Sequence, residues 1–133
     1  MKAGRDHLDY LQDIMTMMEK IESFTAGMTK EDFIEDYMAH FAVIRAMEVM
    51  GEAAKNVPPE VRQKHPEIPW KKMAGPRDKV IHGYFGVDLF IIWESTTKLI
   101  PGYRPVLLRI LNEETERCKK TPGYEFTHDE SGP

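Results

Sequence analysis

Apolar residues recur at helical spacing along most of the chain. The first stretch of this pattern steps by three and four residues through Leu8, Leu11, Met15, Met18 and Ile21. Because residues spaced in this way lie on one face of a helix, the pattern predicts a helix over about residues 5–24 with a single apolar stripe. The helix-breaking sequence TAG, which follows Phe24, closes this first helix.

A second apolar stripe begins after Thr29. Asp32 follows Thr29 by three residues, a spacing that resembles a capping box, although the usual acid at that position is Glu. From there the helical period continues to about Asn56 and predicts one long helix. The last turns of this helix contain small residues, among them Gly51 and Ala54, so we expect another helix to cross closely there.

The rest of the chain also follows a helical pattern. The proline-punctuated connector predicts one short helical turn from Pro59, and residues 76–82 predict a further short helix. Residues 87–100, VDLFIIWESTTKLI, predict a buried helix, since a strand would find no pairing partner in this sequence. A last helix over about residues 101–118 is interrupted or entered at Pro105.

Together these patterns predict an all-α fold, an up-and-down bundle of about five helices. We divide the chain into one helical domain, residues 1–118, and a polar C-terminal tail, residues 119–133. The tail contains proline and glycine and no apolar stripe, so we expect it to be mobile.

Composition narrows the class of protein. The 133 residues are enough for one domain with its own core. The formal net charge of -4 argues against a broad nucleic-acid-binding surface, so any nucleic acid must be held by a local basic cluster. The single cysteine, Cys118, excludes an intramolecular disulfide and a cysteine-based zinc site. No apolar run has the length of a signal peptide or a membrane span, so we expect a soluble, cytoplasmic protein without membrane contacts.

The densest cluster of candidate chemistry lies in residues 70–84, WKKMAGPRDKVIHGY. Pro76 suits the first turn of a helix and Gly83 suits the position just past a helix end. His82 then falls in the last turn, where the helix dipole favours its protonated form. Asp78 lies four residues earlier on the same face and can orient the ring. His82 is therefore a candidate acid or base for proton transfer near neutral pH.

Arg77 lies five residues before His82, so the two side chains are about 140° apart around the helix axis. A two-fold symmetric dimer would bring the arginine and the histidine of both subunits into one cleft. Such a cleft suits metal-independent cleavage of RNA, with histidine transferring a proton and arginine stabilising the crowded phosphate. From spacing alone, however, a helix cap and a solvated arginine explain the same residues more simply.

Other charged residues invite a functional interpretation that the sequence does not favour. Glu48 and Glu52 share one helix face, but the predicted helices lack the Glu-x-x-His partner motifs of di-metal bundles, so no metal site is predicted. Arg45 and Lys55 each lie three residues from one of these acids, which favours a surface charge network. Three scattered histidines receive no role: His7, His40 and His65.

Residues 44–89 resemble the hallmark region of HepT-like HEPN proteins, the toxin halves of prokaryotic toxin–antitoxin pairs. The resemblance rests on coinciding motifs: the run GEAAKN, the entry IPW, an arginine with four residues before a histidine, and a tyrosine two residues after that histidine. It extends more loosely from Arg5 to about Leu111. One position departs from the family, which usually has Asn where this chain has Asp78.

The resemblance implies an all-α HEPN bundle that forms a homodimer. It implies a metal-independent endoribonuclease toxin that cleaves RNA, with tRNA as one candidate substrate, and it needs no cofactor. The implied catalytic pair is Arg77 and His82, with Asp78 in support. The implied partner is a cognate minimal nucleotidyltransferase antitoxin, as in HepT–MntA type (type VII-like) pairs, which silences the toxin by AMPylation of Tyr84.

Two other functions fit the same residues. One is a non-catalytic helical partner that presents Tyr84, or a nucleotide, to a nucleotidyltransferase. The other is a plain helical dimer without chemistry. An RNA-cleavage assay on the purified chain separates both from the ribonuclease.

Overall fold

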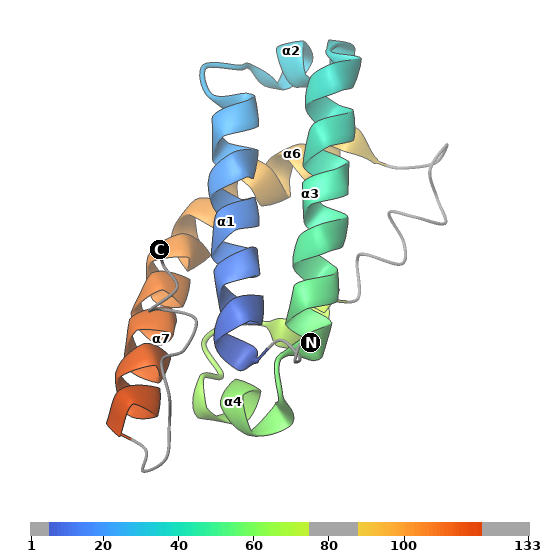
Figure 1. Cartoon of the computed structure of the whole chain (residues 1–133). Helices are drawn as coiled ribbons and strands as arrows, with labels where there is room; N and C mark the ends of the chain where they lie inside the picture. Colours follow the sequence, from blue (N-terminus) through green and yellow to red (C-terminus); the bar gives the residue numbers. More distant parts are fainter. Residues whose placement is uncertain (1–5, 75–87, 121–133) are drawn as a thin grey trace.

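The computed structural model describes residues 6–74 and 88–120, and every regular element in these two ranges is helical (Figure 1). The elements, in chain order, are α1 (His7–Thr25), α2 (Lys30–Glu35), α3 (Tyr37–Asn56), α4 (Pro59–Lys64), α6 (Leu89–Glu94), the π-helical turn η2 (Ser95–Leu99) and α7 (Ile100–Lys120). Residues 70–74 are helical as well. The predicted all-α fold is confirmed. No helix within the described ranges is both long and apolar enough to cross a membrane.

The core lies where α1 packs against α3 on one side and α7 on the other (Figure 1). The predicted apolar stripe of α1 forms its centre, and four of its five residues are at most 3% exposed: Leu11, Met15, Met18 and Ile21. Leu8 is half-buried, and Ile14, which the predicted stripe did not include, is fully buried. From α7, Leu107 and Ile110 are fully buried. Burial of one such side chain stabilises the fold by about 1.5–3 kcal/mol, so this stripe accounts for much of the packing energy. Ala54, one of the small residues expected at a close crossing, is also fully buried.

The helix starts are fixed by acidic and hydroxyl caps. Asp6 and Asp9 form a reciprocal capping box at α1, which begins about two residues later than the pattern predicted. The predicted capping box between Thr29 and Asp32 is confirmed, because the Thr29 hydroxyl accepts from the Asp32 amide at 3.0 Å and the Asp32 carboxylate accepts from the Thr29 amide at 3.1 Å.

The single long helix predicted after Thr29 is wrong, since Asp36 divides it into α2 and α3. Asp36 has an extended backbone, with φ -94° and ψ 96°, and its carboxylate accepts from the Ala39 amide at 3.0 Å. It therefore ends α2 and caps α3. An aspartate can compete with the helix for backbone donors in this way, and an apolar period alone does not register the interruption.

The helix predicted over residues 87–100 is confirmed, although its burial is only partial. Ile92, Thr96 and Ile100 face the core, whereas Phe90 and Ile91 are 54% and 62% exposed. The helix that was expected to be buried is therefore buried along one side and exposed along another. Pro105 does not interrupt the last helix, since it lies inside a continuous α7.

Candidate active site

All four predicted site residues lie in residues 75–87, outside the described residues. These are the predicted catalytic pair, the supporting acid and the modified tyrosine: Arg77, His82, Asp78 and Tyr84. The short helix predicted over residues 76–82 lies there too. These assignments therefore stay predictions. The structure does describe the two stretches of chain that lead into this segment and out of it.

The stretch that leads into the segment is anchored at Trp70, which is 7% exposed. Its indole Nε1–H donates to the carbonyl oxygen of His65 at 2.9 Å. Its backbone amide donates to the Ile68 carbonyl at 2.9 Å, and the Met73 amide donates to the Pro69 carbonyl at 2.9 Å. Ile68 is itself 1% exposed. The chain thus enters residues 70–74 through a turn that is fixed by side-chain and backbone hydrogen bonds.

His65 belongs to a buried polar cluster around Glu114 of α7. Glu114 is 2% exposed, and its Oε2 lies 2.8 Å from Nε2 of His65. Its other oxygen, Oε1, accepts from Arg117 Nη2 at 2.6 Å and lies 3.3 Å from Nε2 of His7. The cluster therefore joins the first turn of α1, the connector after α4 and the last turns of α7.

Glu114 is ionised in this cluster. Burial is the largest influence and acts to raise the pKa of Glu114, but hydrogen bonds from Arg117 and His65 together hold that pKa below its ordinary value. An ionised carboxylate only accepts hydrogen bonds, so Nε2 of His65 carries the proton that it donates to Glu114.

The cluster continues to Cys118, one turn after Glu114. The Cys118 sulfur lies 3.7 Å from Nε2 of His7, and burial raises the pKa of the thiol. A thiol with a raised pKa remains protonated near neutral pH and is a poor nucleophile. In the part of the chain that the structure describes, no group of three or more His, Cys, Asp and Glu side chains is arranged to hold a metal ion.

The stretch that leads out of the segment begins at Asp88, the N-cap of α6. Its carboxylate accepts from the Phe90 amide at 2.9 Å. Trp93 packs against Phe33 of α2 with ring centroids 5.3 Å apart, and the Lys30 ammonium lies 4.9 Å from the centroid of the Phe90 ring. The far end of the segment is therefore tied to α2. In Figure 1, α6 lies higher along α3 than the yellow-green chain that follows α4.

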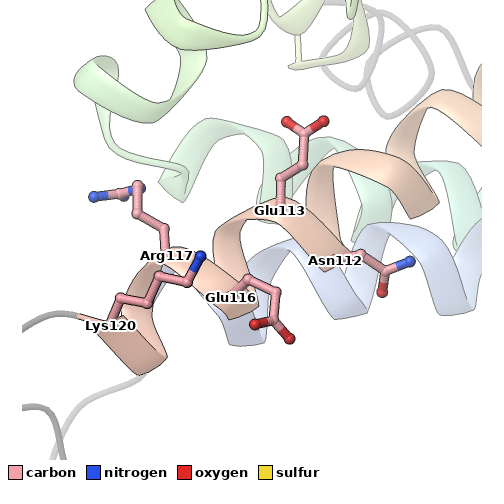
Figure 2. A pocket seen from close by; sticks show the side chains of 5 residues that line it. All are labelled: Asn112, Glu113, Glu116, Arg117 and Lys120. Atoms are coloured by element: carbon pink, nitrogen blue, oxygen red, sulfur yellow. The ribbon is translucent and has the colours of Figure 1, made fainter.

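A surface hollow on α7 does not form a site. Figure 2 shows that its lining side chains all come from this single helix and point in different directions: Asn112, Glu113, Glu116, Arg117 and Lys120. Acids and bases are mixed, and no second element closes the hollow. It offers no convergent set of groups for a substrate.

The predicted surface charge network is present at Arg45, whose Nη1 lies 3.0 Å from Oε1 of Glu48. The buried cluster was not predicted, because His7 and His65 have no ligand-like spacing in the sequence. One signal for it was available. Glu114 follows Leu107 and Ile110 at helical spacing, so it occupies a position in the apolar stripe of α7 where a charged residue needs a buried partner.

Comparison with known proteins places this helical chain among ribonucleases. A family model described as Ribonuclease HepT-like matches residues 14–110. A protein of Thermococcus cleftensis named "Probable ribonuclease HepT" is 50% identical over 100 residues, which cover 75% of this chain and 91% of that protein. The chain belongs to the HepT-like ribonuclease family.

Further relatives carry similar names. A "Putative RNase" of Methanocaldococcus jannaschii is 42% identical over 113 residues, 85% of this chain and 97% of that protein. A "Putative RNase" of Caldanaerobacter subterraneus subsp. tengcongensis is 43% identical over 115 residues, 86% of this chain and 99% of that protein. No solved structure matches the chain. The predicted family and the ribonuclease class are confirmed.

Proposed function

We propose that the chain is a metal-independent endoribonuclease that acts as the toxin of a type VII-like toxin–antitoxin pair in the cytoplasm. The observation that carries this proposal is the family match over residues 14–110, which encloses the arginine, the histidine and the tyrosine of the predicted site. Arg77 and His82 are the catalytic pair, and RNA, with tRNA as one candidate, is the substrate.

The proposed reaction needs only proton transfer and charge stabilisation. His82 of one subunit accepts the proton of a 2'-hydroxyl, whose oxygen attacks the adjacent phosphorus. The bond from phosphorus to the 5'-oxygen breaks, and a second histidine donates a proton to that leaving oxygen. Arg77 stabilises the charge on the phosphate oxygens in the transition state. The products are a 2',3'-cyclic phosphate and a 5'-hydroxyl. Asp78 supports His82 by orienting the ring.

A homodimer supplies the two histidines and two arginines that this reaction requires. The described surface of α3 supports a dimer, because it exposes adjacent large apolar side chains. Tyr37 is 71%, Met38 84% and Phe41 49% exposed, and the rings of Tyr37 and Phe41 stack at 6.0 Å. Exposed apolar side chains gathered on one face favour association in water.

The proposed control is covalent. A cognate minimal nucleotidyltransferase transfers AMP from ATP to the Tyr84 hydroxyl and releases pyrophosphate. Tyr84 lies two residues after His82, so the added phosphate and adenosine would compete with the RNA backbone for Arg77 and block access to the cleft.

Cleavage of RNA in excess EDTA tests the proposal. The wild type is expected to cut, while Arg77→Ala and His82→Ala each lose cutting and keep the circular dichroism spectrum of the wild type. Arg45→Ala is the matched control, because it removes a surface arginine that pairs with Glu48 on its own helix. Equal RNA loss from all four proteins would identify a contaminating nuclease and favour the non-catalytic partner instead.

A further inference from the structure

Two buried hydrogen bonds link α7 to the chain that leads into the predicted catalytic segment. Nε2 of His65 donates to Oε2 of Glu114 at 2.8 Å, and the His65 carbonyl accepts from Nε1 of Trp70 at 2.9 Å. Glu114 and His65 are 49 residues apart in sequence. We name these three residues the Glu114–His65–Trp70 clamp.

All three members of the clamp are buried, with exposures of 2%, 6% and 7% in the order of its name. Hydrogen bonds in such surroundings are strong and directional, and each fixes one register between its partners. An apolar contact of the same area would allow the connector to shift slightly against α7. Between His65 and Trp70, Pro66 and Glu67 are exposed and Ile68 is buried in the core. The clamp therefore holds this connector together with Ile68 and with the ion pair between Glu67 and Arg109 of α7.

The charged hydrogen bond between Glu114 and His65 stabilises the fold little more than an apolar contact in its place would. A buried ion pair loses its hydration, and replacement by well-packed apolar side chains is often neutral or stabilising. Burial alone would raise the pKa of Glu114, but hydrogen bonds from Arg117 and His65 hold that pKa below its ordinary value, so the carboxylate is ionised and accepts from His65. What the arrangement provides is a fixed position of the connector relative to α7.

We propose that the Glu114–His65–Trp70 clamp positions Arg77 for RNA cleavage. Residues 70–74 are helical and begin at Trp70, and Arg77 follows Ala74 by three residues. Three residues of chain span at most about 11 Å, so the position of Ala74 limits where Arg77 can lie. A displacement of 1 Å at a reacting group can cost about a hundredfold in rate. The clamp members are positioning residues, and the inference rests on the proposed ribonuclease function.

Four single substitutions, made in the whole chain, test the clamp. His65→Leu removes the donor to Glu114, whereas His65→Gln keeps an N–H that can reach it. Trp70→Phe removes only the indole donor and part of the ring. Ile14→Val is the matched control, because it loosens the core of α1 without touching a clamp residue. The measurements are single-turnover RNA cleavage and amide hydrogen exchange of residues 70–74.

If the clamp positions Arg77, the amide hydrogens of residues 70–74 are expected to exchange faster in His65→Leu and in Trp70→Phe. Both variants are also expected to cleave RNA at least about tenfold more slowly, while their affinity for the substrate changes much less. His65→Gln is expected to recover most of the rate, and Ile14→Val to leave both measurements near wild type. An unchanged cleavage rate in folded His65→Leu and Trp70→Phe would overturn the clamp and leave the ribonuclease intact. A wild type that does not cleave RNA would overturn the proposed function, and the positioning role with it.

Discussion

Replacement of Glu114 by alanine tests the buried cluster through stability, without any assumption about activity. The substitution leaves the N–H of His65 unpaired in a site where that side chain is 8% exposed, which costs about 1–3 kcal/mol. The truncated side chain also leaves a small cavity, worth about 1 kcal/mol. Arg117 contributes little to the loss, because its side chain is 47% exposed and can turn to water. The expected loss of unfolding free energy is about 3 kcal/mol, or roughly 10 °C in Tm.

Urea denaturation followed by circular dichroism measures this loss at fixed protein concentration, since dimer formation would otherwise shift the midpoint. Glu114→Gln keeps the volume and one acceptor oxygen, so we expect it to lose about half as much. The double variant His65→Leu with Glu114→Leu is expected to recover part of the loss, because neither member stays unpaired. A loss below about 0.5 kcal/mol in Glu114→Ala would refute the reasoning, since it would show that the cluster is hydrated or not formed.

The remaining predictions concern acid stability, a helix cap, the dimer and the modified tyrosine. The pKa of Glu114 is lower in the folded protein than in the unfolded chain. The stability that Glu114 contributes is therefore fully present above the unfolded pKa and is lost as the pH falls through the folded pKa. The difference in urea midpoint between the wild type and Glu114→Gln is expected to narrow below about pH 4.5. Asp36→Ala is expected to cost about 1 kcal/mol in the same assay and Asp36→Asn much less, because asparagine also caps α3; equal losses would contradict the cap. Met38→Glu is expected to shift sedimentation from dimer to monomer, and an intact dimer would place the interface elsewhere. Incubation with ATP, magnesium and the nucleotidyltransferase is expected to add AMP to the wild type and not to Tyr84→Phe, as intact mass would report; AMP on both would refute the assignment.

Helical periodicity was enough to predict the class of fold. The apolar stripe of α1 lies on one face of the helix, and four of its five predicted residues are buried. Periodicity did not reveal the break at Asp36, because the stripe continues on both sides and the interruption comes from a side chain that competes for backbone donors. Nor did it reveal that Phe90 and Ile91 are exposed, since apolar content alone does not say how many neighbours a helix has.

The candidate site was accessible from the sequence through a motif and not through periodicity. From spacing alone, a helix cap and a solvated arginine explain these residues more simply, and the family match over residues 14–110 is what favours the ribonuclease. The buried cluster at Glu114 shows the opposite case. Its partners His7 and His65 come together only through tertiary packing of α1, the connector and α7, so no local pattern joins them.

The chemical ends of the cleaved RNA test the central claim most directly. The account predicts that the wild type, in excess EDTA, leaves a 2',3'-cyclic phosphate and a 5'-hydroxyl, because a 2'-oxygen attacks the phosphorus when histidine, and no metal-bound water, drives the reaction. His82→Ala, purified in parallel, is expected to leave the RNA intact. Fragments with a 3'-hydroxyl and a 5'-phosphate, or cleavage that disappears with EDTA, would contradict the account.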